Sequence, residues 1–431
     1  MNLSIGELPV EGHLSTLRGL TLEAEGCKAA IGSRCLIDTV NGDSVEAQVV
    51  GFNRGRTLLM PAGSVDGLRS QARVKPIAKQ AMAPTGAGLL GRVIDAHANP
   101  IDGLGPLHVS GYVPLLGEPI NPLNRASVNE VFDVGVRAIN GLITLGRGQR
   151  VGLFAGSGVG KSALLGMMTQ HSEAEVTVIG LIGERGREVN DFVRDTLGSA
   201  GMRNAIVVAV PADQAPLLRL QGAMLATAIA ESFRNEGKHV LLLMDSLTRF
   251  AQAQREIGLA TGEPPTSKGY PPSAFAMLPQ LLERAGNLAS GGSITGIYTV
   301  LAEGDDQNDP IVDSARAVLD GHIVLTRALS DSAHYPAIDI GASVSRIRSS
   351  VNNQEQESLI RRCLQLAAAY KSQEDMIRVG LYQKGSDLLL DEAVEFWPRL
   401  LPFLQQSVDS GVAIDASRKQ LAEILSVSNG S

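Results

Sequence analysis

The sequence is poor in cysteine and aromatic residues and has no long apolar run. Only 4% of its 431 residues are aromatic, and its three cysteines, Cys27, Cys35 and Cys363, form no C-x-x-C pair. Their odd number and wide spacing argue against a disulfide framework or a cysteine-rich metal site and are typical of a reducing cytoplasm. The longest apolar runs, such as 240–244, are strand-length. They fall far below the roughly 20 residues that span a bilayer.

An excess of basic charge is also missing. The formal net charge is −7, so no general attraction draws the chain to nucleic acid or to an anionic membrane. Residues 1–7 lack the basic start and following apolar stretch of a signal peptide, and we expect none. A chain of 431 residues is nevertheless too long for one core and predicts two or three domains.

Three patterns follow one another along the chain. Residues 20–78 alternate short strands with turn signals, such as Asn41-Gly42, and predict a small β-barrel or sandwich. Residues 80–125 are rich in Gly and Pro and indicate a linker with one or two strands. From 135 to 345 apolar strands alternate with amphipathic helices, which predicts a mostly parallel sheet covered on both faces. After 350 the strands stop and helical periodicity begins.

These patterns predict an α/β fold with three domains. The central strands are expected at 151–154, 176–182, 205–210, 240–244, 294–300 and 323–325, with a long helix at 215–235. Later helices are expected at 354–370, 373–381 and 387–396. We assign residues 1–78 to an N-terminal β-barrel domain, 79–348 to the mostly parallel core and 349–431 to a helical domain.

The most informative segment is 155–162, which reads A-G-S-G-V-G-K-S and follows an apolar strand. A glycine-rich turn between a strand and a helix gathers backbone N–H groups around a phosphate, and the helix N-terminus adds positive partial charge. Lys161 is placed to reach the β- and γ-phosphates and Ser162 to ligate Mg²⁺. Ala155 stands where the strict pattern has glycine. The predicted nucleoside triphosphate-binding residues are Gly156, Ser157, Gly158, Val159, Gly160, Lys161, Ser162 and Ala163.

Acidic residues follow two of the predicted strands. The run 239–245 ends in Asp245, and Glu184 comes directly after 176–182 and Gly183. Carboxyl ends of parallel strands meet at one edge of the sheet, where ligands bind. We therefore expect Asp245 to hold Mg²⁺ through water and Glu184 to orient or deprotonate the attacking water. The alternative for Asp245 is to cap the helix that follows it.

Three further side chains have two interpretations each. Arg249 lies four residues past Asp245 and either pairs with that carboxylate or contacts the γ-phosphate. Arg346 is either a surface arginine or a finger that completes the site of a neighbouring subunit. Tyr335 either stacks on an adenine or fills core.

Five motifs together resemble the catalytic subunits of the F-type and V-type rotary ATPases. They are A-G-S-G-V-G-K-S (155–162), G-E-R-G-R-E (183–188), L-L-L-M-D-S-L-T-R (241–249), Y-P-A-I-D (335–339) and S-V-S-R (343–346). Within this superfamily the chain is most similar to the flagellar protein-export ATPases, with the virulence type III secretion ATPases next. The stretches that favour the flagellar branch are 139–150, 211–213, 262–265 and 282–286.

The resemblance implies a RecA-like P-loop core, a homohexameric ring and Mg²⁺-ATP sites at the subunit interfaces. It implies ATP hydrolysis that energises protein export by releasing substrates and chaperones. The implied roles are phosphate and Mg²⁺ binding for Lys161 and Ser162, the catalytic carboxylate for Glu184, the Walker B acid for Asp245, positions near the γ-phosphate for Arg185 and Arg249, adenine contact for Tyr335, and the finger into the neighbouring site for Arg346.

The resemblance also implies partners and a location. The partners are a stator-type regulatory protein at the N-terminus, a coiled-coil stalk protein in the ring, export chaperones and substrates, and the export gate at the inner membrane, reached from the cytoplasm. The acidic loop 303–310 resembles the loop that faces a rotary shaft and either meets the stalk or cargo, or is a solvated turn. The sequence departs from the family pattern in two places. The acidic coupling segment is missing near Asp387, which argues against direct torque generation. Glycines interrupt residues 1–20, where relatives carry a helix that binds the stator protein.

Three alternative functions are weighed. The first is an ATPase that serves a virulence type III secretion system instead of the flagellar export system. A hexameric nucleic-acid motor shares the core but calls for a basic, aromatic N-terminal platform. In residues 1–78 Phe52 is the sole aromatic residue and the basic residues are scattered, so no nucleic acid is expected. A regulatory subunit that binds nucleotide without hydrolysis would lack the acid that Glu184 supplies.

Overall fold

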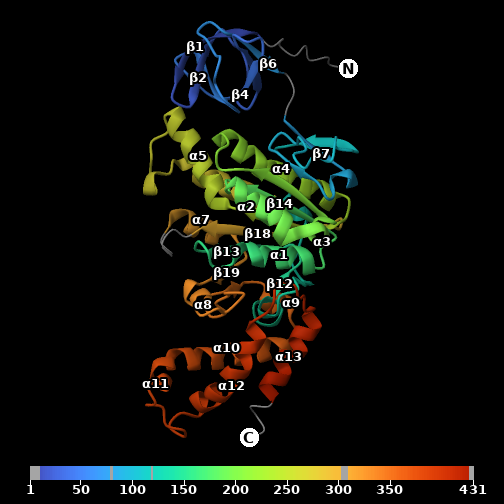
Figure 1. Cartoon of the computed structure of the whole chain (residues 1–431), viewed down its shortest axis with the longest axis vertical. Helices are drawn as coiled ribbons and strands as arrows, with labels where there is room; N and C mark the ends of the chain where they lie inside the picture. The colour runs from blue at the N-terminus through green and yellow to red at the C-terminus, as the bar shows by residue number, and fades with distance from the viewer. Residues whose placement is uncertain (1–9, 78–80, 118–119, 302–308, 427–431) are drawn as a thin grey trace.

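The computed structural model of the chain describes residues 10–77, 81–117, 120–301 and 309–426. Figure 1 shows an elongated molecule with a β-barrel at one end, a layered α/β core in the middle and helices at the other end. The predicted fold class is confirmed in each of these three parts. No helix among the described residues combines the length and the apolar character that a membrane crossing needs.

The N-terminal strands close into a six-stranded barrel in the order β1-β2-β5-β4-β3-β6. Each of these six strands pairs with a neighbour on both sides, so the barrel that they form has no free edge strand. Leu22, Ile37 and Leu59 are fully buried in its interior. The expected turn at Asn41-Gly42 joins β3 to β4, with Gly42 at φ 88°. The strands are β1 Gly12–Arg18, β2 Thr21–Glu25, β3 Arg34–Asp38, β4 Ser44–Asn53, β5 Arg56–Pro61 and β6 Arg73–Ile77.

The central sheet has the strand order β20-β19-β13-β18-β16-β14-β15-β8. From β19 to β8 the strands are parallel, and the six predicted strands all occur within two residues of their expected ends. Their bounds are β13 Arg150–Ala155, β14 Val176–Ile182, β15 Ala205–Val210, β16 His239–Asp245, β18 Ser293–Leu301 and β19 Gly321–Leu325, with β8 Val93–Ile94 and β20 Val344–Ser345 at the edges.

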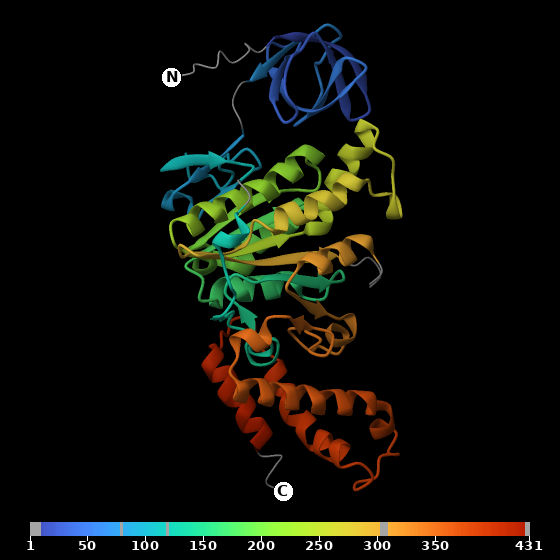
Figure 2. The same cartoon turned by 180° about the vertical axis from the view of Figure 1, so that it is seen from behind.

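Helices cover both faces of this sheet, as Figure 2 shows from behind. One apolar cluster joins the sheet to α4, α5, α6 and α7, and a second joins the opposite face to α1 and to the C-terminal helices. Continuous apolar strands need cover on both sides, which explains the two layers. The helices are α1 Lys161–His171, α2 Gly186–Asp191, α3 Gly198–Met202, α4 Pro216–Asn235, α5 Leu247–Thr261, α6 Pro272–Leu282, α7 Pro310–Val318, α8 Arg327–Asp331 and α9 Arg348–Val351.

The segment 80–125 holds more structure than the expected linker. Strand β7 (Met82–Thr85) pairs with β9 (Gly111–Pro114), and β8 extends the central sheet beside β15. Arg92 donates to both carboxylate oxygens of Asp102 at 2.8 and 2.9 Å, and the N–H of Val93 also donates to Asp102. These bonds hold the glycine- and proline-rich chain against the core, which composition alone does not show.

The C-terminal helices pack on the core rather than apart from it. They are α10 Gln354–Ser372, α11 Glu374–Arg378, α12 Leu388–Leu404 and α13 Ile414–Ser426. Helix α12 continues past the expected end at 396 and through Pro398 and Pro402. A proline inside a helix costs about 3 kcal/mol, but burial of Leu400 and Phe403 offsets that cost. Helix α13 was not expected from the sequence.

A buried ion pair connects α4 to the chain that follows α6. Arg284 donates through Nε and Nη2 to the two carboxylate oxygens of Glu231, and both side chains are about one-tenth exposed. Removing one member leaves a buried charge without compensation. We expect Glu231→Ala to lower the free energy of unfolding by about 3 kcal/mol in urea denaturation followed by circular dichroism. Lys384→Ala, which breaks an exposed pair with Glu395, is the control and should change little. Equal effects of both variants would contradict this assignment.

Candidate active site

A cavity of about 730 Å³ opens at the carboxyl ends of β13, β14 and β16. The turn after β13 forms one wall, and Glu184 and Arg185 after β14 form another. Ala155 is the last residue of β13 and is buried, which explains why a methyl group is tolerated there. Of the predicted phosphate-loop residues, Val159 is buried in the core instead, while Gly156, Ser157, Gly158, Gly160, Lys161, Ser162 and Ala163 line the cavity.

The loop backbone leaves the start of α1 open to the cavity. Gly158 and Gly160 have φ values of 79° and 88°, a conformation that residues with a Cβ rarely adopt. Gly160 is the N-cap of α1 and makes no side-chain cap bond. The first N–H groups of α1 have no partner within the helix, and such groups attract an anion.

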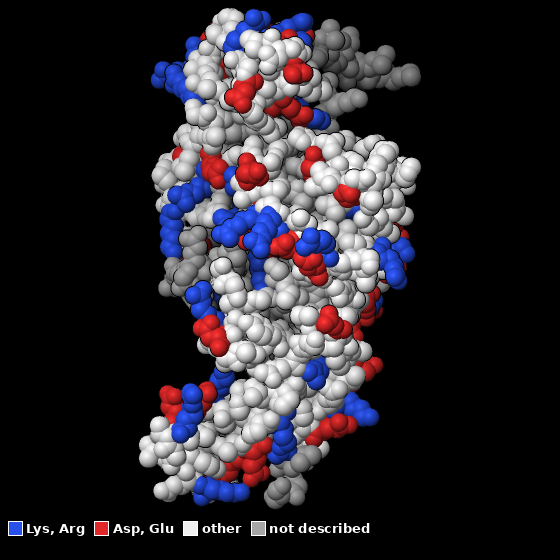
Figure 3. Space-filling view, in the orientation of Figure 1, with Lys and Arg blue, Asp and Glu red and all other residues white. Residues whose placement is uncertain are grey.

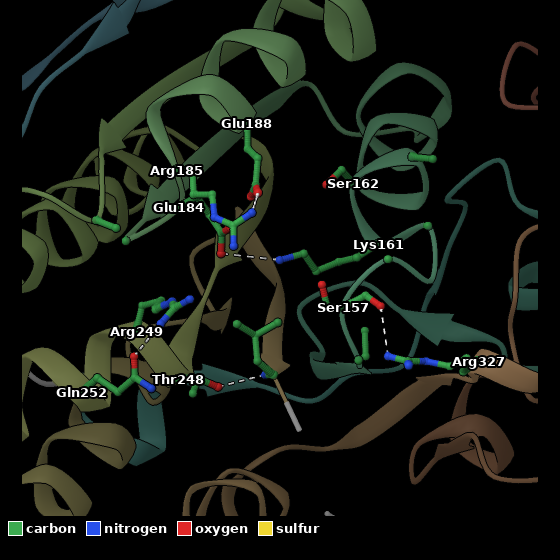
Figure 4. Close-up of a pocket in the computed structure, with 18 residues that line it drawn as sticks. Ser157, Lys161, Ser162, Glu184, Arg185, Glu188, Thr248, Arg249, Gln252 and Arg327 are labelled. Atoms are coloured by element: carbon green, nitrogen blue, oxygen red, sulfur yellow. Dashed lines mark hydrogen bonds and ion pairs between the residues drawn. The ribbon is translucent and has the colours of Figure 1, made fainter. Parts of the chain in front are cut away.

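Lys161 contacts both of the acidic residues. Its Nζ lies 2.7 Å from Asp245 Oδ1 and 3.5 Å from Glu184 Oε1. Figure 4 shows Lys161 reaching from the loop across the cavity toward Glu184. Burial disfavours the ammonium charge, but the two carboxylates outweigh burial and hold the pKa of Lys161 above its usual value. The three predicted residues therefore form one cluster.

Asp245 is held from two sides at the end of β16. Its Oδ1 also accepts a hydrogen bond of 2.6 Å from the hydroxyl of Thr299, and the residue is 3% exposed. The capping interpretation is wrong, because Ser246 is the N-cap of α5 and its hydroxyl accepts from the N–H of Arg249. Asp245 therefore does not cap α5.

Glu184 has the properties of a residue poised to exchange a proton near neutral pH. Burial, reinforced by the charge of Asp245, raises its pKa to about 7, although Lys161 opposes the shift. Its Oε1 is buried and accepts no hydrogen bond among the described residues. Glu188 accepts a hydrogen bond of 3.3 Å from the exposed Arg185.

Arg249 faces the cavity rather than Asp245. Its Nη1 donates to Gln252 Oε1 at 2.9 Å, and in the described part of the chain it makes no ion pair with Asp245. Its side chain packs against Gly183, where an added Cβ would lie 2.8 Å from Arg249 Cβ. Of its two interpretations, the pair with Asp245 is wrong.

Tyr335 lies beside the loop, whereas Arg346 lies away from it. An added Cβ on Gly160 would be 3.5 Å from the Tyr335 ring, and Tyr335 is 45% exposed, so it does not fill core. Arg346 follows β20 and donates to the backbone oxygen of Arg316 at 3.1 Å. It does not line the cavity of its own chain.

Sequence reasoning missed Arg327, which lines the same cavity. It begins α8 after β19, and its Nη2 lies 3.5 Å from the backbone oxygen of Ser157. Because β19 is parallel to β13, the rule that located Asp245 applies to Arg327 as well. The sequence signal was an arginine two residues beyond the predicted strand 323–325.

The oxygen donors of the cavity fit a magnesium ion that arrives with a nucleotide. Magnesium takes one or two protein oxygens and fills its remaining positions with phosphates and water. Ser162 and Glu184 line the cavity, where Ser162 offers a hydroxyl and Glu184 an oxygen without a hydrogen bond. Asp245 does not line the cavity itself, but its carboxylate contacts Lys161, which does. Within the described ranges no group of three or more His, Cys, Asp or Glu side chains is arranged as a metal centre, so the protein alone does not form a complete coordination shell.

Comparisons with known proteins agree with this geometry. Residues 135–345 match the nucleotide-binding domain of the ATP synthase alpha/beta family, and residues 352–423 match the C-terminal domain of the T3SS EscN ATPase. The chain is 54% identical to the flagellum-specific ATP synthase of Pseudomonas aeruginosa, over 96% of this chain and 93% of that protein. Its counterpart in Salmonella typhimurium is 53% identical, over 92% and 90%.

Solved structures extend the likeness to the whole architecture. The assembled ATPase EscN from the enteropathogenic E. coli type III secretion system superposes with a TM-score of 0.90 at 41% identity, covering 96% of this chain and all of that one. EscN in complex with its central stalk EscO gives a TM-score of 0.88 at 40% identity, with the same coverage. With its phosphate loop and two acidic strand ends, the chain belongs to the flagellum-specific ATP synthase family of ATP-hydrolysing enzymes.

Proposed function

We propose that the chain hydrolyses Mg²⁺-ATP at the edge of β13, β14 and β16 and thereby energises flagellar type III protein export. The observation that carries the proposal is the buried cluster in which Lys161 bridges Asp245 and Glu184. In this cluster Lys161 supplies a cation that can bind phosphate, and Asp245 supplies a carboxylate that can bind a metal. Glu184 supplies a carboxylate with a pKa of about 7. Phosphoryl transfer to water requires these three components.

Each residue has a distinct task in this proposal. The loop N–H groups and Lys161 bind the phosphates, and Ser162 and Asp245 would hold the metal, which would neutralise charge on the β- and γ-phosphates. Glu184 orients the attacking water and accepts its proton as the water oxygen bonds to the γ-phosphorus, while the bond from that phosphorus to the leaving oxygen of ADP breaks. Arg249 and Arg185 offset charge on the γ-phosphate, and Tyr335 flanks the adenine. These last assignments are supported by positions around the cavity.

The site is completed by a neighbouring subunit. Arg346 lies outside the cavity of its own chain, so we propose that it enters the next subunit's site as an arginine finger. EscN has been solved in assembled form, and the likeness over 96% of this chain supports the same assembly, which we take to be a homohexameric ring.

The three-domain division and the remaining partners belong to the same proposal. We assign 1–78, 79–348 and 349–431 to barrel, ATPase core and helical domain. The EscN complex supports a central stalk protein in the ring. We further propose a stator-type regulator at the N-terminus, chaperones and export substrates as cargo, and a cytoplasmic position at the inner-membrane export gate. No nucleic-acid partner is proposed, because both signs of charge occur on the barrel face in Figure 3.

The expected contacts with the stalk and with the stator-type regulator fall largely on residues that the structure does not describe. Residues 302–308 of the acidic loop are not described, while Asp309 caps α7 through the N–H groups of Ile311 and Val312. Residues 1–9 are likewise outside it, and Gly12–Arg18 form strand β1. The flagellar assignment is favoured over the virulence system because the relatives are named flagellum-specific at 53–54% identity.

Replacing the catalytic carboxylate tests hydrolysis directly. We expect Glu184→Gln to lower kcat by at least about 100-fold, because the amide cannot accept the proton from water. ADP binding, measured by fluorescence titration, should stay close to that of the unaltered protein. Glu175→Gln, which alters an exposed acid at the other end of β14 that pairs with Lys238 and lies outside the cavity lining, is the control and should keep its turnover. Unchanged turnover in Glu184→Gln would exclude the assigned role.

The rate should also depend on pH through Glu184. A base with a pKa of about 7 is protonated below that value and active above it. We therefore expect kcat/KM, which reports the free enzyme, to rise about tenfold per pH unit below pH 7 and to level off above it. Steady-state ATPase assays across this range measure the profile. A profile that is flat through pH 7 would show that Glu184 does not titrate as the essential base.

Mixed assemblies test the finger. Neither Arg346→Ala nor Lys161→Ala chains should hydrolyse ATP well alone. Mixed together, they create interfaces with Lys161 from one chain and Arg346 from the other, and ATPase activity should partly recover. The control mixes Lys161→Ala with Glu184→Gln chains. Both changes lie on the same side of the interface, so no site is complete and no recovery is expected. Absence of recovery in proven mixed rings would place Arg346 outside the neighbour's site.

A further inference from the structure

Thr299 lies next to Asp245 in the middle of the sheet. Strands β16 and β18 are parallel neighbours, with Met244 opposite Tyr298, so the residue after each lies at the same level. Thr299 has no exposed surface, and its hydroxyl donates to Asp245 Oδ1 at 2.6 Å. The hydroxyl also lies 3.4 Å from the backbone oxygen of Met244. The shorter contact, to a charged acceptor, is the stronger of the two.

Thr299 and Lys161 use the same oxygen of Asp245. Lys161 Nζ is 2.7 Å from Oδ1, and the Thr299 hydroxyl approaches that oxygen too. The two donors fix Oδ1 and leave Oδ2 as the oxygen available to a metal or its water. When phosphates draw Lys161 away, Thr299 is the donor that continues to hold the carboxylate.

The position of Thr299 is itself rigid. A β-branched side chain has restricted χ1 rotation in a strand. The end of β18 is fixed to α5 as well, because the N–H of Leu301 donates to the Thr248 hydroxyl at 2.9 Å. The hydroxyl of Thr299 is therefore restricted to a position beside Asp245.

We propose that Thr299 is a positioning residue that holds the Asp245 carboxylate in the orientation needed to bind a metal-coordinated water. This inference rests on the proposed function, because it assumes that Asp245 serves a metal at this site. Residues that orient a metal-binding carboxylate commonly contribute 10- to 100-fold to metal affinity.

Thr295 provides a matched control on the same strand. It lies four residues earlier and therefore on the same face of β18, and it is also fully buried. Its hydroxyl accepts a hydrogen bond of 2.9 Å from the N–H of Gly148, at the other end of the sheet from Asp245. Thr295→Val therefore removes a buried hydroxyl without touching the metal acid.

The test is ADP binding to the full chain with and without Mg²⁺, followed by fluorescence titration. We expect Thr299→Val to bind ADP in the presence of EDTA like the unaltered protein. The increase in ADP affinity on adding Mg²⁺ should be about tenfold smaller. Thr299→Ser should restore the increase because it keeps the hydroxyl, and Thr295→Val should match the unaltered protein. Thr299→Ala serves as a second hydroxyl-free variant if Thr299→Val does not fold.

Two results would overturn the inference in different ways. If Thr299→Val responds to Mg²⁺ as Thr295→Val does, Thr299 is a structural residue and the proposed function still stands. If the unaltered protein shows no effect of Mg²⁺ on ADP affinity, the metal role of Asp245 falls, and the proposed function falls with the inference.

Discussion

The site depends on one buried cation placed between two carboxylates. Lys161 lies 2.7 Å from Asp245 and 3.5 Å from Glu184, and all three side chains are largely buried. Without Lys161 the two acids would repel each other in a medium of low dielectric. With it, Asp245 is held by an ion pair while Glu184 keeps a pKa of about 7. A triphosphate that binds the ammonium group of Lys161 would change the charge around Asp245 and Glu184 together.

The order of strands in the sheet creates this cluster. Strand β16 lies between β14 and β18, and β13 lies between β18 and β19. The carboxyl ends of these parallel strands therefore lie along one edge of the sheet. At or just after these ends come Lys161, Glu184, Asp245 and Arg327. The α1 helix that begins with Lys161 shares its apolar cluster with the C-terminal helices. Packed side chains thus connect the helix that begins at the phosphate loop to the C-terminal helices.

The sequence predicted the elements better than it predicted their contacts. The central strands are continuous apolar runs, and Glu184 and Asp245 follow them directly, so the rule of the shared edge brings both to the phosphate loop. Thr299 was invisible because its partner depends on which strand lies beside β18, and chain order does not give that neighbour. Arg346 remains a prediction, since its expected target belongs to another subunit. The extent of α12 was missed because packing, not propensity, carries the helix through Pro398.

Proton exchange on nucleotide binding is the most direct test of the Lys161 cluster. Calorimetric titration of ADP in EDTA at pH 7, in buffers of different ionisation enthalpy, measures the protons taken up. The phosphates add negative charge and draw Lys161 away, and both changes raise the pKa of Glu184 above its value of about 7. We expect the unaltered protein to take up a fraction of a proton more than Glu184→Gln. Equal proton exchange in the two proteins would contradict the coupling of Lys161, Asp245 and Glu184.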